Sequence, residues 1–218
     1  MHKVIDNLEE IKDKLNQLKT DLQEKVKIIA VSKTFFMKDI EPLIKYGHED
    51  FGENKIQEAV SKWSDIKDKN PKLKLHMIGK IQTNKVKFLL PLFDYIHSLD
   101  SLKLAQKISD EEIKKKKKLK IFIQVNIGDE SQKGGINIKD LNEFYSKCIN
   151  GLNLNIIGLM CMPPQNKNPS DCFSLLKKLA KDLGIFELSM GMSNDYEEAI
   201  KCGSTYIRVG SNIFGKRN

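Results

Sequence analysis

The chain has 218 residues, of which 40% are hydrophobic and 30% are charged, and its formal net charge is +8. This length is enough for one large domain and lies at the short end of the range of α/β barrels. No apolar run approaches the ~20 residues that span a bilayer, and the opening segment MHKVIDNLEE lacks the apolar core of a signal peptide. We therefore expect a cytoplasmic protein with no membrane partner.

An amphipathic helix is predicted at the amino terminus. Its apolar residues are spaced alternately four and three apart, which draws one stripe along a helix of roughly five turns. They are Val4, Leu8, Ile11, Leu15, Leu18 and Leu22. Such a stripe packs against the body of a domain or pairs in a coiled coil, and we expect packing because about three heptads are few for a coiled coil.

The rest of the chain alternates strand-length apolar runs with helical patterns. The eight predicted strands cover residues 28–33, 50–53, 75–79, 95–99, 121–127, 155–162, 186–190 and 206–210. The helical patterns between them cover residues 38–46, 55–63, 83–90, 102–114, 138–149, 169–183 and 195–201. Strict alternation of strand and helix implies right-handed crossovers and a parallel sheet.

Eight parallel strands close such a sheet into a barrel. We therefore predict an α/β fold, a single-domain (β/α)8 TIM barrel over residues 1–218 with an additional N-terminal helix. An open, doubly wound sheet is the alternative, but the glycine-rich dinucleotide fingerprint is absent after the first strand. We find no domain linker.

The first predicted strand ends in a lysine. The stretch KIIAVSKT, residues 27–34, is an apolar run followed by a polar cluster that includes Lys33. In α/β barrels the chemistry lies at the carboxyl ends of the strands, where the loops converge. A partly desolvated amine at this place could form a Schiff base. The alternative is a solvated lysine at the start of a loop.

Other strands deliver polar residues to the same mouth of the barrel. They are Gly52, Glu53 and Asn54 from the second strand, His76 and Gly79 from the third, His97 and Ser98 from the fourth, and Asn126 from the fifth. Neither His76 nor His97 has a carboxylate partner close in the sequence. We interpret both histidines as satisfied core or loop residues rather than as catalytic bases.

The last two strands end in a pattern typical of anion binding. Gly191 and Gly210 let backbone amides approach a ligand, and Ser193 and Ser211 add hydroxyl donors ahead of a helix start. Barrels often hold a phosphate in the loops after strands seven and eight, although glycine–serine turns are also common without one. Arg208 would face the same interior as Gly210 and would need an acceptor there. A phosphate site, a reactive lysine and an arginine describe a pocket for pyridoxal phosphate (PLP).

Two further features have simpler interpretations. Cys148, Cys161, Cys172 and Cys202 form no Cys-x-x-Cys pair and have no histidines at metal-site spacing, so we expect reduced, mostly buried thiols and no metal. The lysines at residues 114–118 permit nonspecific attraction to nucleic acid, but they also fit a solvated helix end that the helix dipole favours. We expect the solvated helix end and no nucleic-acid partner.

The motifs at the strand ends form a recognisable set. They are AVSKT at 30–34, FGEN at 51–54 with Gln57 and Glu58, HMIG at 76–79 with Gln82, Asn84 and Lys85, KGG at 133–135, GLM at 158–160, LSMGMS at 188–193 with Asp195, and RVGS at 208–211 with Phe214 and Gly215. In these motifs, over essentially its whole length, the chain resembles the pyridoxal phosphate homeostasis protein family, single-domain relatives of the barrel half of bacterial alanine racemase.

The resemblance implies a barrel that holds PLP as a Schiff base on a lysine. The implied cofactor-binding residues are Lys33, Asn54, Ser193, Arg208, Gly210 and Ser211. By similarity, Lys33 carries the cofactor and Arg208 lies near its pyridine nitrogen. An adjacent positive charge disfavours protonation of that nitrogen. The phosphate is held, by similarity, by the two serines and Gly210, and Asn54 lines the pocket.

The resemblance also implies a biological role. Members of the family are regarded as acting in intracellular PLP (vitamin B6) homeostasis, with PLP-requiring apo-enzymes as recipients and without established catalytic turnover. Alanine racemases have a second, β-rich domain that supplies an opposite base, and we expect none here because the sequence reaches its last residue soon after the final motif. The alternative function is a weak one-base PLP-dependent amino acid racemase. We expect a monomer.

Overall fold

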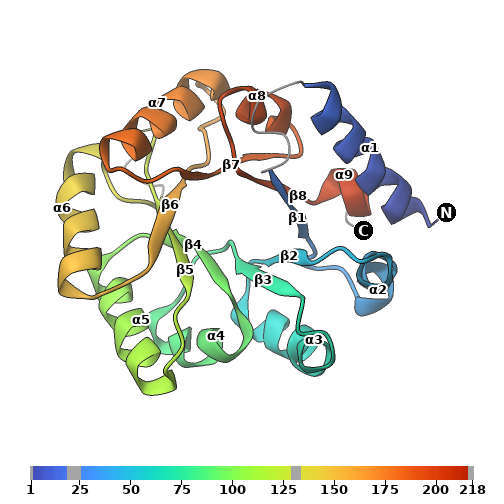
Figure 1. Ribbon diagram of the computed structural model, residues 1–218, viewed down its shortest axis with the longest axis horizontal. Coiled ribbons are helices and arrows are strands. Elements are labelled where there is room, and N and C mark those ends of the chain that lie inside the picture. Colours follow the sequence, from blue (N-terminus) through green and yellow to red (C-terminus); the bar gives the residue numbers. More distant parts are fainter. Residues whose placement is uncertain (1, 19–25, 129–133, 216–218) are drawn as a thin grey trace.

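Eight parallel strands form a closed barrel in the computed structural model, which describes residues 2–18, 26–128 and 134–215 (Figure 1). The strands are β1 (Lys27–Val31), β2 (Asp50–Glu53), β3 (Lys74–Met77), β4 (Tyr95–Leu99), β5 (Lys120–Gln124), β6 (Ile156–Met160), β7 (Glu187–Met192) and β8 (Tyr206–Val209). Each strand pairs with its neighbours in sequence order, and β8 pairs with β1 in parallel, which closes the sheet. The predicted barrel is confirmed, and the open-sheet alternative is wrong.

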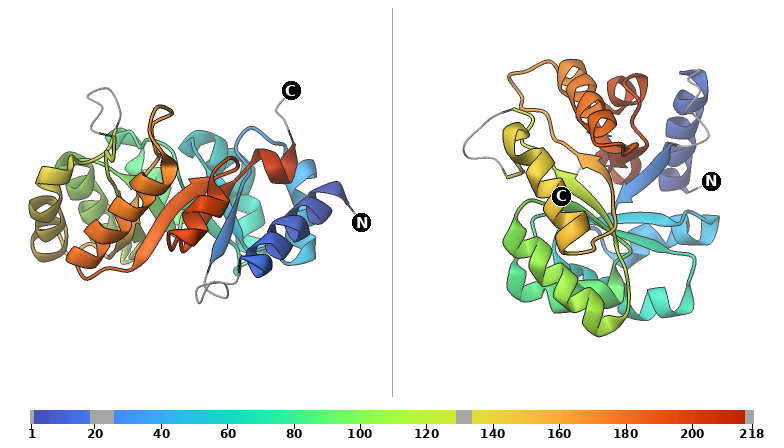
Figure 2. Two further views of the ribbon diagram at one scale, coloured as in Figure 1. Left: turned by 90° about the horizontal axis from the view of Figure 1, so that it is seen from above. Right: turned by 60° about the vertical axis from the view of Figure 1, so that its left-hand side comes forward.

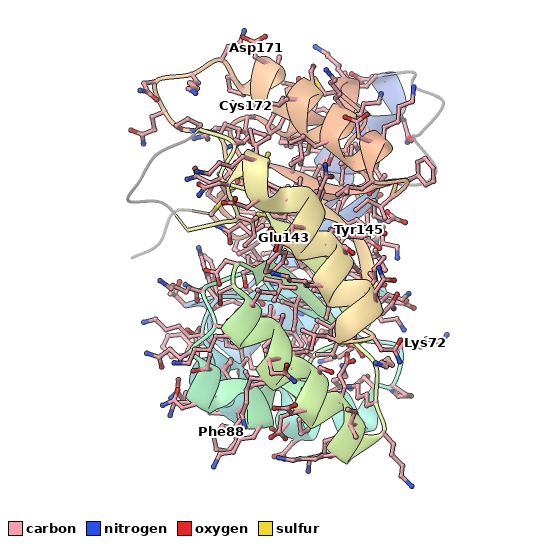
Figure 3. All side chains as sticks on the ribbon, turned by 90° about the vertical axis from the view of Figure 1, so that its left-hand side faces the viewer. Lys72, Phe88, Glu143, Tyr145, Asp171 and Cys172 are labelled. Carbon is pink, nitrogen blue, oxygen red and sulfur yellow. The ribbon has the colours of Figure 1, made fainter. Side chains whose placement is uncertain are left out.

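Helices follow the strands and surround the barrel (Figure 2). They are α2 (Met37–Tyr46), α3 (Ile56–Lys69), α4 (Val86–Leu92), α5 (Leu102–Lys115), α6 (Leu141–Ser146), α7 (Pro169–Asp182), α8 (Tyr196–Lys201) and α9 (Ser211–Phe214). The 3₁₀ segments η2 (Thr83–Lys85) and η3 (Ile138–Asp140) precede α4 and α6, and the π-helical turn η4 (Lys147–Gly151) follows α6. Glu143 of α6 and Phe88 of α4 lie on the outer surface of this ring of helices (Figure 3). None of the described helices is long and apolar enough to cross a membrane.

The amino-terminal helix α1 (Lys3–Gln17) packs on the barrel through the predicted stripe. Val4, Leu8, Ile11 and Leu15 are buried. Its neighbours are α2 and α9, and Asn7 Nδ2 donates a hydrogen bond to the carbonyl of Ile213 at 2.8 Å. The stripe therefore packs on the body of the same chain, as expected. Leu18 follows the helix and is half-buried, whereas Leu22 lies outside the described residues.

Two layers of apolar side chains make the core. A small cluster of Ile29, Tyr95, Phe122, Met160 and Tyr206 lies together, and a much larger cluster joins the strands to the helices around them. Strand β4 is buried at all five of its positions, as expected for a parallel strand covered on both faces. Full burial of one Leu or Phe side chain stabilises a fold by about 1.5–3 kcal/mol, so this second layer supplies the main driving force for closing the barrel.

Four of the five lysines at residues 114–118 are exposed, as expected for a solvated helix end, and Lys117 differs. Lys114 and Lys115 occupy the last turn of α5 and are exposed, as expected. Lys117 is half-buried and donates to the carbonyls of Leu90 and Phe93 at 2.7 and 2.9 Å. The run is therefore partly a structural cap that ties α5 to the end of α4.

The four cysteines are free thiols, and Cys148, Cys161 and Cys172 are buried. Burial raises the pKa of Cys148 and of Cys161 to about 12. Both thiols therefore stay protonated and unreactive at neutral pH. The expectation of mostly buried thiols is confirmed.

Candidate functional site

A cavity of about 530 Å³ opens at the carboxyl ends of the barrel strands. Its walls come from the turn after β1, the loop at residues 162–169 after β6, the turn after β7 and the end of β8. Five of the six residues expected from the sequence line it, namely Lys33, Ser193, Arg208, Gly210 and Ser211. The structure thus brings residues of β1, β7 and β8 to one place, and their roles toward a cofactor stay predictions.

Lys33 lies in a turn rather than at the end of a strand. Strand β1 ends at Val31, and the amide of Ser32 still donates to the carbonyl of Gly52 at 3.0 Å. The chain then turns, because the amide of Phe35 donates back to the carbonyl of Ser32 at 3.1 Å. The predicted strand at 28–33 was therefore two residues too long. Lys33 is half-buried and lines the cavity from this turn.

The opposite wall consists of two turns that are bonded to each other. The amide of Gly210 donates to Ser193 Oγ at 3.3 Å, and Asn212 Nδ2 donates to the carbonyl of Ser193 at 3.0 Å. Within the first turn, Asp195 Oδ1 accepts a hydrogen bond from the amide of Met192 at 2.6 Å. The two turns therefore form one unit, which we call the anion wall (residues 192–195 and 210–212).

The structure explains one of the two predicted glycines by packing and the other not. Gly191 has φ +91°, and an added Cβ would lie 2.6 Å from Cβ of Ala199, so both the backbone and the helix α8 require it. Gly210 has φ −116°, which any residue adopts, and an added Cβ would meet Val31 at an ordinary 3.4 Å. The packing of the chain thus gives Gly210 no reason to be glycine, which fits a wall kept bare for a ligand.

Arg208 enters the cavity from inside the barrel and is 5% exposed. One guanidinium nitrogen donates to Ser189 Oγ at 2.6 Å, and another donates to the carbonyl of Cys161 at 3.0 Å. The acceptor that an interior arginine needs is therefore present. Burial lowers the pKa of Arg208, but a guanidinium starts from so high a value that it stays charged at neutral pH.

Arg208 begins a chain of hydrogen bonds that runs through the barrel. Ser189 Oγ is 2.7 Å from His97 Nδ1, His97 Nε2 is 3.0 Å from His76 Nδ1, and His76 Nε2 is 2.9 Å from Asp50 Oδ1. Because an arginine can only donate, every atom is satisfied when each group donates to the next. Both histidines then carry their hydrogen on Nε2, and the chain ends on a carboxylate.

The charges along this chain follow from burial. Desolvation lowers the pKa of His76, and it lowers that of His97 further, with His76 and Arg208 adding to the effect. Both rings are therefore neutral at pH 7, and the contact with Asp50 is a hydrogen bond rather than an ion pair. Both histidines are fully buried and neither lines the cavity. The interpretation as satisfied core histidines agrees with this arrangement.

Asn54 stands apart from the residues that line the cavity. It follows β2, and its backbone packs so closely on Gly79 that an added Cβ there would lie 2.2 Å from the carbonyl oxygen of Asn54. Its Oδ1 atom is buried without a hydrogen-bond partner among the described residues. Its contribution to a pocket stays a prediction.

The cavity carries a positive surplus. Among the described lining residues, Lys33, Lys167 and Arg208 are cationic and Asp195 is the acid. Lys167 escaped sequence reasoning, although the proline-bounded loop around it follows the sixth strand directly. Three cations, hydroxyl donors and one bare glycine in a space of this size fit a small phosphorylated molecule. A primary amine in the same cavity adds a group that can react with a carbonyl.

Comparisons with known proteins decide the family. The family described as alanine racemase, N-terminal domain, matches residues 7–218. A pyridoxal phosphate homeostasis protein from Aquifex aeolicus is 36% identical over 200 residues, which cover 88% of this chain and 87% of that protein. This chain belongs to the pyridoxal phosphate homeostasis protein family. The homeostasis protein of Escherichia coli is 33% identical and covers 100% of this chain and 98% of its own length.

Solved structures agree with the family. PipY from Synechococcus elongatus without PLP has a TM-score of 0.84 at 32% identity and covers 94% of this chain and 100% of PipY. PipY with PLP bound has a TM-score of 0.82 at 31% identity, with the same coverage. An alanine racemase from Clostridium difficile, at 14% identity and a TM-score of 0.73 over 57% of its length, shares the fold. The resemblance read from the motifs is confirmed.

Proposed function

We propose that this homeostasis protein binds PLP in the 530 Å³ cavity, with Lys33 as the residue that bonds to the cofactor. The observation that carries the proposal is the arrangement of an amine and the anion wall in one cavity. PLP joins an aldehyde and a phosphate on one small ring, so it needs both features at once. PipY, a relative of the same size and fold, has been solved with PLP bound.

Each residue has a role that its chemistry supports. When bound, PLP supplies an aldehyde that condenses reversibly with an amine and releases one water. The hydroxyl groups of Ser193 and Ser211 and the bare wall at Gly210 suit the phosphate. Arg208, already tied to Ser189 and charged, would stand by the ring nitrogen and keep it unprotonated, because two adjacent positive charges repel.

Asn54 completes the proposed set. Its Oδ1 atom is buried and has no partner among the described residues, although it stands outside the cavity lining. A buried acceptor without a partner is unfavourable by about 1–3 kcal/mol. A ligand hydroxyl or an ordered water that reaches this atom would remove the penalty.

The wider role we propose is cofactor homeostasis: the protein holds PLP reversibly and releases it to enzymes that require it. The names of the curated relatives support this role. We propose that the chain acts as a cytoplasmic monomer and as a single domain over residues 1–218. The burial of the α1 stripe against its own barrel supports the monomer, because this apolar face is already covered.

A weak one-base racemase is the alternative, favoured by the match to the racemase barrel domain. Among the described lining residues the carboxylate is Asp195, and its Oδ1 already accepts from the amide of Met192. Exchange of the α-proton of alanine into deuterated water separates the two functions. Exchange at enzymatic rates that vanishes in Lys33→Ala would favour the enzyme over the carrier.

The proposal is tested by the visible absorption of the purified protein with PLP, before and after borohydride, followed by peptide mapping. Wild type should show a visible absorption band that borohydride abolishes. Peptide mapping should then find the reduced cofactor, which serves as the label, attached to Lys33. Lys167→Ala is the matched control, since Lys167 is an exposed lysine of the same cavity. We expect the label to persist in Lys167→Ala and to be absent in Lys33→Ala. A wild type that stays colourless and unlabelled refutes the proposed function.

A further inference from the structure

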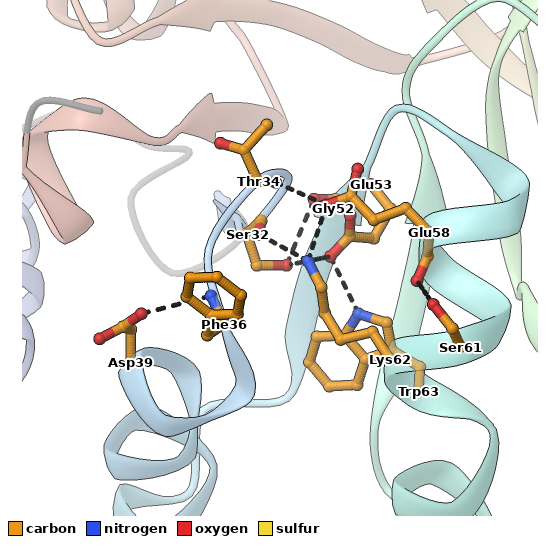
Figure 4. A network of polar contacts seen from close by, with 10 residues as sticks. All are labelled: Ser32, Thr34, Phe36, Asp39, Gly52, Glu53, Glu58, Ser61, Lys62 and Trp63. Atoms are coloured by element: carbon orange, nitrogen blue, oxygen red, sulfur yellow. Dashed lines mark hydrogen bonds and ion pairs between the residues drawn. The ribbon is translucent and has the colours of Figure 1, made fainter. Parts of the chain in front are cut away.

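The turn that carries Lys33 is held from helix α3 by two side chains (Figure 4). Glu58 Oε1 accepts a hydrogen bond from the amide of Thr34 at 2.6 Å. Lys62 Nζ donates to the carbonyl of Ser32 at 2.9 Å. The two bonds therefore hold the backbone of the residues immediately before and immediately after Lys33. Neither Glu58 nor Lys62 lines the cavity.

Lys62 has a complete set of acceptors. Its ammonium reaches the carbonyl of Ser32, Glu53 Oε1 at 3.0 Å and Glu58 Oε1 at 3.0 Å. An ammonium has three hydrogens to donate, so each has an acceptor. The side chain of Lys62 is 9% exposed, and at such burial charged hydrogen bonds are stronger than at the surface.

Glu53 anchors this group to the barrel. It is fully buried, and its Oε1 also accepts from Ser32 Oγ at 2.8 Å and from Trp63 Nε1 at 2.9 Å. Trp63 is itself fully buried. Lys62 is therefore bonded to the turn and to a buried carboxylate of the barrel at once, and Glu58 is joined to this group through Lys62.

The backbone of the turn needs such support. Thr34 has φ +70°, a left-handed conformation that is unfavourable by roughly 1–2 kcal/mol for a residue with a Cβ and is rare for a β-branched one. Burial disfavours the charged form of Glu58, but the Thr34 amide and Lys62 outweigh it, so the pKa of Glu58 is lowered. A charged acceptor thus meets the strained amide at neutral pH.

We propose that Glu58 and Lys62 are positioning residues for Lys33: they hold the strained turn so that its amine projects into the cavity at the place where the aldehyde of bound PLP would lie. This inference rests on the proposed function. It adds that covalent capture of the cofactor depends on helix α3, outside the cavity, whereas recognition of the phosphate does not.

The first experiment compares two ligands on the full chain. Pyridoxine 5′-phosphate has the ring and phosphate of PLP but an alcohol in place of the aldehyde, so it reports non-covalent binding of the ring and phosphate without the bond to Lys33. In Glu58→Ala we expect the affinity for PLP to fall about tenfold, as for the loss of one charge-assisted hydrogen bond. The affinity for pyridoxine 5′-phosphate should stay within about twofold of wild type, because the anion wall is untouched.

Two further variants test whether Glu58 acts through its hydrogen bond to the Thr34 amide. Glu58→Gln keeps an oxygen that accepts from the Thr34 amide and should recover PLP affinity to within about threefold of wild type. Ser61→Ala is the control, because Ser61 is exposed on the same helix and donates only to the carbonyl of Glu58. Equal losses for both ligands in Glu58→Ala, or no loss for either, would overturn the positioning role.

The second experiment needs no cofactor. The Thr34 amide should exchange its hydrogen slowly in wild type and Ser61→Ala, and about tenfold faster in Glu58→Ala, because its acceptor is lost. An unchanged exchange rate would overturn the inference. If wild type takes up no PLP at all, the proposed function fails, and the exchange rate still decides whether α3 holds the turn.

Discussion

The two sides of the cavity are built in different ways. On the amine side, the bonds that hold the turn of Lys33 reach 24 residues along the chain to Glu58 and 30 residues to Lys62. On the anion side, Asp195 bonds to an amide only three residues away, and the two turns of the anion wall are 17 residues apart. One side depends on a neighbouring helix, and the other holds itself.

This difference separates two properties of the site. The anion wall is held by bonds within and between its own two turns, so we expect phosphate recognition to tolerate changes in helix α3. A turn held by an ion-pair network on α3 is sensitive to that helix, so we expect a change in α3 to displace the amine of Lys33. The following predictions test the separation, from the largest expected effect to the smallest.

On the anion side, the largest loss of stability should come from a change that strains the backbone. In Gly191→Ala, left-handed strain and overlap with Ala199 should together lower the free energy of unfolding by about 3 kcal/mol. Gly47→Ala is the matched control, because Gly47 also has positive φ but nothing lies within 4 Å of an added Cβ. It should lose only about 1 kcal/mol, from the strain alone. Urea unfolding measures both, and equal losses would show that the contact with α8 is unimportant.

The hydrogen-bond chain below the anion wall should matter for stability and less for the phosphate. Ser189→Ala leaves buried donors and acceptors of Arg208 and His97 unpaired and should lower the free energy of unfolding by about 2 kcal/mol. Ser109→Ala, which removes a single bond to a carbonyl, is the control and should lose about 1 kcal/mol. If the affinity for inorganic phosphate, which lacks the ring beside Arg208, falls together with stability in Ser189→Ala, the anion wall does depend on the hydrogen-bond chain.

The buried histidines predict a loss of stability in mild acid. Burial lowers the pKa of His48, His76 and His97 below the usual 6.5. At a pH between the histidine pKa values of the folded and the unfolded chain, the unfolded chain binds more protons. The free energy of unfolding therefore rises with pH in this range and is lost as pH falls below about 6.5. Each ring contributes a slope of up to ~1.4 kcal/mol per pH unit.

Urea unfolding at pH 7 and at pH 5 measures this dependence. His97→Gln removes one titrating group and should flatten the slope, although its stability at pH 7 is lower than that of wild type. A wild-type stability that is equal at the two pH values would contradict the neutral, fully bonded histidines. Asp50 does not affect the comparison of pH 7 with pH 5. Its pKa is lowered in the folded chain, so its contribution to stability is lost only below about pH 3.8.

The anion side and the strand that leads to Lys33 were readable from the sequence because their signals are local. The alternation of strand and helix predicted the barrel, and paired glycines and serines marked the ends of β7 and β8. The end of the first strand was predicted two residues too late, because an apolar pattern does not show where the chain leaves the sheet.

The long-range contacts were not readable. Nothing near His76 in the sequence indicates that its partner is Asp50, 26 residues earlier on a neighbouring strand. The same holds for Lys62, which looks like any other lysine of an amphipathic helix. Asn54 is a further example, since the close approach of its backbone to Gly79, 25 residues later in the chain, has no signal in the local sequence.

Substitution of Asp195 should give the smallest change in ligand affinity, and it separates the effect of charge from that of the hydrogen bond. Its carboxylate accepts a hydrogen bond from the amide of Met192 and also places a negative charge within the anion wall. Asp195→Asn keeps an acceptor and removes the charge, so it should bind pyridoxine 5′-phosphate about twofold more tightly, with little loss of stability. Asp195→Ala removes both, so it should lose about 1 kcal/mol of stability and bind the ligand less tightly than the Asn variant, because the turn that carries Ser193 loosens. Calorimetric titration of both variants decides the point. If both bind more tightly by the same factor, charge alone matters and the turn does not depend on its own bond, which removes the contrast between a wall that holds itself and an amine that is held by α3.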